Sequence, residues 1–215
     1  MRRWIAPLLA LCLLLPSLVF PQRLMAAPIQ EAVFAGGCFW CLEHDLEGLP
    51  GVISVESGYS GGTVANPSYR QVSAGGTGHQ ESVLVRFDPD RLSYSRLLEA
   101  YWRNVDPLDG GGQFCDRGDS YRAVIFTRGA TQAAQAESSA DAKARQLKVS
   151  RSSLAVQIKP LQRFWAAEGY HQNYAQRNMV RYSYYRWACG RDQRLRQVWG
   201  ASQSDPPLDP AEFPA

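Results

Sequence analysis

The pattern of apolar and polar positions predicts strands and helices that alternate irregularly. Apolar residues three and four apart predict a helix from about Cys38 to Gly48. A second helix is expected after Ser93, which can cap it, and a third, rich in alanine, over 130–148. Short apolar runs bounded by turn residues predict strands at 32–35, 51–59, 81–87, 121–127 and 155–158. We therefore expect an α+β fold, a two-layer α/β sandwich around a mixed sheet, in one domain.

The two ends of the chain differ in composition from its middle. The first 26 residues hold three arginines and no carboxylate, and their apolar stretch from Ile5 to Phe20 is shorter than the about 20 residues of a spanning helix. A basic start, an apolar middle and small residues at the end are typical of a secretory signal peptide. We expect 1–26 to be a signal peptide cleaved after Ala26, with an uncleaved membrane anchor as the less favoured alternative. The protein is then expected to be exported, to the periplasm.

The proline-rich end, 201–215, is expected to be disordered, which leaves 30–200 as the catalytic domain.

The charge of the chain argues against a nucleic-acid partner. Of 215 residues, 23 are Lys or Arg and 20 are Asp or Glu, a net charge of +3. Because the three arginines of the first 26 residues account for that excess, the remainder balances at 20 − 20 = 0. The folded part therefore has no electrostatic reason to bind nucleic acid or an acidic membrane.

The cysteines indicate redox chemistry. Export places them in an oxidising compartment, and the four that follow the expected leader are too few for a disulfide scaffold. They are Cys38, Cys41, Cys115 and Cys189. We expect some to be working thiols and Cys115 to be a small buried apolar residue. A single Cys-x-x-Cys offers too few ligands for zinc, so no metal site is expected.

The densest motif is Gly36-Gly37-Cys38-Phe39-Trp40-Cys41. Two glycines allow a sharp turn out of the first strand, and the helix then begins near Cys38. A thiol at a helix N-terminus faces free N–H groups and the positive end of the dipole, which lower its pKa. Cys38 is therefore a candidate nucleophile, with Phe39 and Trp40 as an aromatic wall beside it.

This motif and those that follow it resemble the peptide methionine sulfoxide reductase A family. The resemblance extends over about residues 32–200 and rests on several motifs in the family's order. They are Leu49-Pro50-Gly51-Val52, Ser57-Gly58-Tyr59-Ser60-Gly61-Gly62, Asn66-Pro67-Ser68-Tyr69, Gly78-His79-Gln80-Glu81-Ser82-Val83, Asp106-Pro107, Asp116-Arg117-Gly118-Asp119-Ser120-Tyr121-Arg122 and His171-Gln172-Asn173-Tyr174.

The resemblance implies reduction of the S epimer of methionine sulfoxide, free or in proteins and peptides, and hence repair of oxidised exported proteins. Cys38 would attack the sulfoxide sulfur, and Glu81 would supply the proton to its oxygen. The other implied site residues are Tyr69 and Tyr121 on the oxygen, Asp116 near the same pocket, and Phe39, Trp40 and Tyr182 around the substrate.

A second thiol must then condense with the sulfenic acid of Cys38. Cys189 is favoured, because the family commonly uses a C-terminal cysteine on a mobile segment and 184–190 is rich in turn and aromatic residues. Cys41, on the same helical turn as Cys38, is the alternative, and a relay through both stays open. The resemblance implies no bound cofactor, a thioredoxin-like dithiol donor of electrons, and a monomer.

Two other functions remain as alternatives. One is a thioredoxin-like dithiol–disulfide exchange protein that uses Cys38 and Cys41, and the other is a secreted binding module with a structural disulfide. Under either, replacing Glu81 by Gln should have little effect, whereas the reductase needs the acid.

Overall fold

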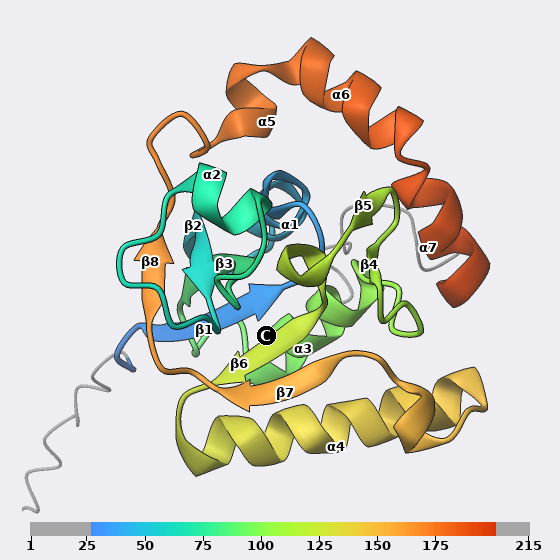
Figure 1. Cartoon of the computed structure of the whole chain (residues 1–215). Coiled ribbons are helices and arrows are strands. Elements are labelled where there is room, and N and C mark those ends of the chain that lie inside the picture. The colour runs from blue at the N-terminus through green and yellow to red at the C-terminus, as the bar shows by residue number, and fades with distance from the viewer. Residues whose placement is uncertain (1–26, 201–215) are drawn as a thin grey trace, which may run out of the picture.

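The computed structural model describes residues 27–200 of the chain (Figure 1). The expected signal peptide, 1–26, and the expected disordered tail, 201–215, lie outside the described residues. Within 27–200, none of the helices has the length and hydropathy needed to cross a bilayer.

The centre of the fold is a six-stranded mixed sheet in the order β7-β6-β1-β3-β2-β8. Its strands are β1 Gln30–Ala35, β2 Val52–Ser60, β3 Gln80–Phe87, β6 Val124–Thr127, β7 Gln157–Pro160 and β8 Phe164–Ala166. Neighbouring strands are antiparallel except for β6 and β7, which are parallel. The expected α+β fold with a mixed sheet is confirmed.

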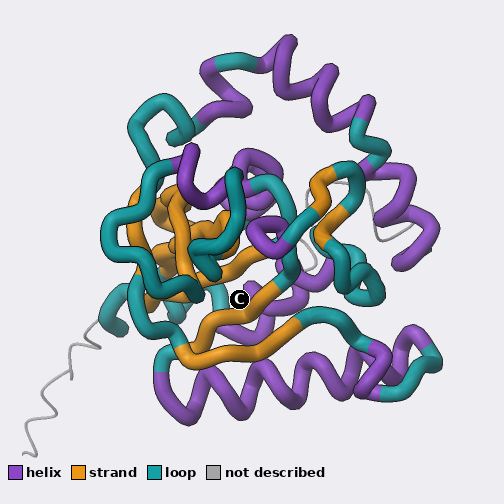
Figure 2. The backbone as a smooth tube through the Cα atoms, in the orientation of Figure 1, coloured by secondary structure: helices purple, strands orange, loops and turns teal. Residues whose placement is uncertain are grey.

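The helices lie around this sheet, as Figure 2 shows in purple. They are α1 Phe39–Glu47, α2 Tyr69–Ser73, α3 Tyr94–Arg103, α4 Gly129–Leu147, α5 Tyr174–Arg177, α6 Met179–Ala188 and α7 Arg191–Trp199. Apolar side chains of α1, α3 and α4 form the main core with one face of the sheet, for example Leu42, Leu98 and Ala140 with Val83. The alanine-rich α4 packs through its small residues, as its composition indicates.

Strand β3 is more deeply buried than its alternating sequence indicates. It lies between β1 and β2, and every residue from Gln80 to Val85 is buried. Val83 faces the main core, whereas Leu84 joins a smaller cluster on the opposite face with Phe126. Because side chains alternate along a strand, Glu81 lies on the same face as Val83, toward α1.

The C-terminal third differs most from the prediction. Residues 179–188, expected to be turn-rich at their end, form α6, which lies between α5 and α7 at the outer edge of the molecule (Figure 1). Strand β8 and the short hairpin of β4 Gly112–Gln113 with β5 Asp116–Arg117 were not predicted either. In the fourth expected strand, 119–121 form a 3₁₀ turn, and β6 begins only at Val124.

Candidate active site

The turn between β1 and α1 places Cys38 at the start of the helix. Gly37 adopts a φ of 82°, and a Cβ there would lie 2.8 Å from Cβ of Gln113, so the chain needs glycine at this position. Helix α1 begins at Phe39 with Cys38 as its N-cap, and no side-chain hydrogen bond caps it. The Cys38 side chain is 6% exposed. The expected helix start is therefore observed.

The carboxyl group of Glu81 meets the first turn of α1. The backbone N–H of Phe39 donates to Glu81 Oε2 at 3.0 Å. Burial raises the pKa of Glu81 to about 8, and the charge of Asp116 acts in the same direction. Glu81 therefore holds a proton near neutral pH, as a general acid must.

The pKa of Cys38 is raised, contrary to the lowering expected from its helix position. Burial is the largest cause, and the nearby Cys41, Glu81 and Asp116 act in the same direction. The hydrogen bond from Cys38 lowers the pKa of Cys41, with a further contribution from the charge of Arg191. Desolvation, the hydrogen bond with Cys41 and the neighbouring carboxyl groups therefore favour the protonated thiol of Cys38.

Two tyrosines complete the surroundings of Glu81. Tyr69 begins α2, and its ring lies 4.5 Å from that of His171 and 6.5 Å from that of Phe39, measured between centroids. Burial and the charge of Glu81 raise the pKa of Tyr69 to about 12, and the pKa of Tyr121 is raised by the same causes. Both phenols therefore keep their protons at neutral pH and can donate hydrogen bonds.

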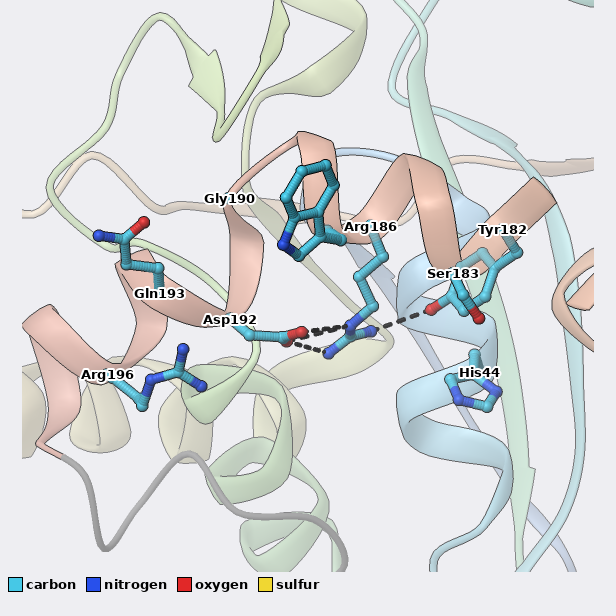
Figure 3. A pocket seen from close by; sticks show the side chains of 9 residues that line it. His44, Tyr182, Ser183, Arg186, Gly190, Asp192, Gln193 and Arg196 are labelled. Carbon is cyan, nitrogen blue, oxygen red and sulfur yellow. Dashed lines mark hydrogen bonds and ion pairs between the residues drawn. The ribbon is translucent and has the colours of Figure 1, made fainter. Parts of the chain in front are cut away.

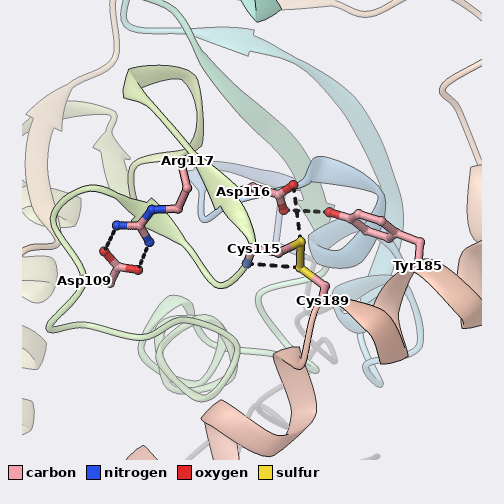
Figure 4. The surroundings of a disulfide bond; sticks show 6 residues. All are labelled: Asp109, Cys115, Asp116, Arg117, Tyr185 and Cys189. Carbon is pink, nitrogen blue, oxygen red and sulfur yellow. Dashed lines mark hydrogen bonds and ion pairs between the residues drawn. A yellow bond between two sulfur atoms is a disulfide. The ribbon is translucent and has the colours of Figure 1, made fainter.

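Asp116 connects the start of α1 to the C-terminal helices. The hydroxyl group of Tyr185 donates to Asp116 Oδ2 at 2.6 Å (Figure 4). Burial raises the pKa of Asp116, while the Tyr185 hydroxyl and the backbone N–H of Cys38 oppose that rise. Tyr185 was not predicted from the sequence, because it lies 69 residues from Asp116 and no motif marks it.

The aromatic residues expected around the substrate occupy different depths. Trp40 is half-buried, stacks on Tyr174 with centroids 3.7 Å apart, and donates from Nε1 to Nδ1 of His171 at 3.1 Å. Phe39 is fully buried in the main core. Tyr182 is buried beside Cys41, and its hydroxyl accepts a hydrogen bond from Arg186 at 2.9 Å. Contact of these residues with substrate stays a prediction.

The cysteines pair in a way that the sequence did not indicate. Cys115 and Cys189 form a disulfide (Figure 4). Cys38 and Cys41 are free thiols. The prediction that Cys115 is a small buried apolar residue is wrong, because it lies exposed on the loop between β4 and β5. Asp116 Oδ1 lies 3.8 Å from Cys115 Sγ, so one carboxylate borders both the disulfide and the first turn of α1.

A groove of about 610 Å³ lies along α6 and α7, with His44 of α1 at its other side (Figure 3). Arg186 crosses it, paired with Asp192 at 2.6 Å and with Asp45 at 2.7 Å. The residues that line this groove do not include Cys38, Glu81 or either tyrosine of the site. The groove is therefore separate from the cluster around Glu81.

Comparisons with known proteins agree with this arrangement. A sequence model of the family described as peptide methionine sulfoxide reductase matches residues 30–203. A relative from Caulobacter vibrioides, named peptide methionine sulfoxide reductase MsrA 2, is 55% identical over 82% of this chain and 89% of its own length. One from Bacillus licheniformis, named peptide methionine sulfoxide reductase MsrA, is 43% identical over 84% of this chain and 99% of its own length.

Solved structures show the same fold. Methionine sulfoxide reductase A of Corynebacterium diphtheriae aligns with a TM-score of 0.65 and 30% identity, over 71% of this chain and 76% of its own. The reduced form of Mxr1 from Saccharomyces cerevisiae aligns with a TM-score of 0.66 over 74% of this chain and 91% of its own, at 24% identity. These matches do not favour the thioredoxin-like alternative. The chain belongs to the peptide methionine sulfoxide reductase A family, and it is an oxidoreductase that reduces methionine sulfoxide.

Proposed function

We propose that this protein reduces the S epimer of methionine sulfoxide by direct attack of Cys38 on the sulfoxide sulfur. The observation that carries the proposal is the buried carboxyl group of Glu81, which accepts a hydrogen bond from the backbone N–H of Phe39, the residue after Cys38, and whose pKa is raised by burial. Sulfoxide reduction needs a proton donor for the departing oxygen, and this carboxyl group lies where it can supply that proton.

The groups around Cys38 suit the first step. The Cys38 sulfur attacks the sulfoxide sulfur while Glu81 gives its proton to the oxygen, and the proton lost by the Cys38 thiol returns to Glu81. Tyr69 and Tyr121 donate hydrogen bonds to the oxygen as charge develops on it. The bond between the two sulfurs and the bond from the substrate sulfur to its oxygen then break as the oxygen passes to Cys38, so the products are methionine and a Cys38 sulfenic acid. Trp40 and Phe39 supply an apolar contact for the methyl group of the substrate.

The second step uses Cys189. Its thiol attacks the Cys38 sulfenic acid, water leaves, and a Cys38–Cys189 disulfide forms. The Cys115 thiol then displaces Cys38 from Cys189, which restores the free Cys38 thiol. The Cys115–Cys189 disulfide and the free Cys38 are the products of that exchange. Resolution by Cys41, whose sulfur is hydrogen-bonded to Cys38, is the competing route.

The reducing equivalents come from a thioredoxin-like dithiol protein, because each turnover leaves Cys115 and Cys189 oxidised and a second dithiol must return them to thiols. We place this reaction outside the cytoplasm, where the protein repairs exported proteins. Support for that location comes from the composition of residues 1–26.

The test uses protein that starts at Ala27, dithiothreitol, and a blocked methionine sulfoxide supplied as separate S and R epimers. We expect thioether product from the S epimer alone and none from Cys38→Ser. After one turnover without reductant, Cys189→Ser should retain the sulfenic acid, while Cys41→Ser should form the disulfide. Turnover of neither epimer, or of the R epimer, would contradict the proposal, and a Cys38–Cys41 disulfide in the parent would favour the competing route.

A further inference from the structure

Helix α6 exposes an apolar face that nothing in the described part of the chain covers. Val180, Tyr184 and Trp187 are 87%, 69% and 76% exposed. They are spaced at i, i+4 and i+7, so they lie on one side of the helix. The rings of Tyr184 and Trp187 are 6.1 Å apart between centroids. Large aromatic side chains gathered on an exposed face are typical of a protein–protein interface.

The C-terminal end of this face is close in sequence to the disulfide, because Cys189 ends α6. Trp187 precedes Cys189 by two residues, about 3 Å along the helix axis, and Val180 lies about 14 Å from it. The hydrogen bond from Tyr185 to Asp116 holds the same end of α6 against the loop that carries Cys115. By helix periodicity, Cys189 lies about 180° around α6 from the centre of this face, on the side of the Tyr185–Asp116 contact. A partner on the face therefore reaches the disulfide around the C-terminal end of α6, where Trp187 and the exposed Cys115 lie.

The two sulfurs differ as targets. Cys115 is exposed and Cys189 is half-buried. The backbone N–H of Cys115 lies 3.2 Å from Cys189 Sγ, so it can stabilise a thiolate there once the bond breaks. Thiol–disulfide exchange is faster at the accessible sulfur and with the more stable leaving thiolate. Both factors direct attack to Cys115 and make Cys189 the leaving group.

The charge around the face indicates the partner's surface. Of the six arginines in residues 174–199, three are buried or paired with carboxylates, namely Arg186, Arg191 and Arg194. Arg181 on α6 and Arg196 on α7 are both exposed. An apolar centre with a basic rim suits a partner whose own redox cysteine lies in an apolar patch with acidic residues around it.

We propose that the face formed by Val180, Tyr184 and Trp187 is the docking surface for a thioredoxin-like dithiol protein, which attacks the disulfide at Cys115. The inference rests on the proposed function, which supplies the disulfide in each cycle. The partner's thiolate bonds to Cys115 and breaks the Cys115–Cys189 bond. Its second thiol then attacks its own sulfur in the mixed disulfide and releases Cys115. The partner is oxidised by two electrons, and the two protons that it loses end on Cys115 and Cys189.

Kinetics test the docking surface. Trp187→Ser is compared with the parent and with Ile53→Ser, which replaces an apolar residue 53% exposed on β2, at the opposite end of that strand from Tyr59, the partner of Glu81. Reduction of methionine sulfoxide is driven either by a bacterial thioredoxin kept reduced by its reductase, or by dithiothreitol. We expect Trp187→Ser to raise KM for thioredoxin about tenfold, as loss of an interface tryptophan does, with the dithiothreitol-driven rate unchanged. Ile53→Ser should match the parent in both assays.

An unchanged KM for thioredoxin would overturn the inference. An equal fall of the thioredoxin-driven and dithiothreitol-driven rates would also overturn it, because Trp187 would then act in folding or chemistry. The same holds if the parent forms an oligomer that Trp187→Ser abolishes without a change in KM, because the face would then bind a second copy of the chain. If the parent reduces neither epimer with dithiothreitol, the proposed function fails instead, so the two failures are distinct.

A trapping experiment tests the attacked sulfur. The oxidised protein is mixed with a thioredoxin whose second redox cysteine is replaced by serine, and the mixed disulfide is digested with trypsin. Cys115 and Cys189 fall in separate peptides, 104–117 and 187–191. We expect thioredoxin on 104–117, and attachment to 187–191 or to the peptide of Cys38 would overturn the assignment.

Discussion

At the scale of single residues, the environment of the carboxyl group of Glu81 matters more than its position in the sequence. A glutamate on a strand is ordinarily an ionised surface group. Here burial raises its pKa to about 8, and the backbone N–H of Phe39 donates a hydrogen bond to it. The side chain can therefore act as an acid at the pH at which the protein works.

Replacing Glu81 by Gln should lower kcat for methionine sulfoxide by about 10²- to 10⁴-fold, because the sulfoxide oxygen loses its proton donor. Alkylation of Cys38 by iodoacetamide should persist, since the amide leaves the thiol in place. In the parent, the activity that depends on the protonated carboxyl should decline as the pH rises through about 8. Full activity of Glu81→Gln would remove the acid assignment.

At the scale of elements, a second buried glutamate links α1 to α5. Glu43 Oε1 accepts a hydrogen bond from the backbone N–H of Asn173 at 3.1 Å, and the side chain is buried. Burial raises the pKa of Glu43 from 4.5 to about 7. The carboxyl group is therefore easier to ionise in the unfolded chain than in the folded one, which makes the stability of this contact depend on pH.

The free energy of unfolding should fall as the pH rises, because the pKa of Glu43 is higher in the folded protein than in the unfolded chain. Below about pH 4.5 Glu43 is protonated in both states, so the neutral group fits the fold without a charge penalty. As the pH rises to about 7, ionisation of the unfolded chain lowers the free energy of unfolding by roughly 3 kcal/mol, and above that the effect is constant. Glu43→Gln should show a smaller decline than the parent in urea titrations at pH 5 and 7.5. Equal declines would mean that Glu43 does not titrate in this way.

At the scale of the whole molecule, the disulfide joins the β4–β5 hairpin to the end of α6 across 74 residues of sequence. A cross-link over a loop of that length restricts the unfolded chain, with a typical contribution of about 2–4 kcal/mol. The C-terminal helices should therefore be held more firmly in the oxidised protein than in the reduced one.

Reduction of the disulfide should lower the free energy of unfolding by about 2–4 kcal/mol, measured by urea denaturation with and without a phosphine reductant. Cys115→Ser is the control, because it lacks the cross-link under both conditions and should show no difference. A parent protein that unfolds at the same urea concentration in both redox states would contradict this prediction.

The sequence by itself determined the class of fold, the helix start at Cys38 and the ordered motifs that identify the family. These depend on local periodicity, turn chemistry and the order of residue types. It did not determine that Cys115 pairs with Cys189, that Tyr185 bonds to Asp116, or that the pKa of Cys38 rises. Only the tertiary structure decided these, because desolvation and contacts between residues about 70 positions apart depend on which elements pack together.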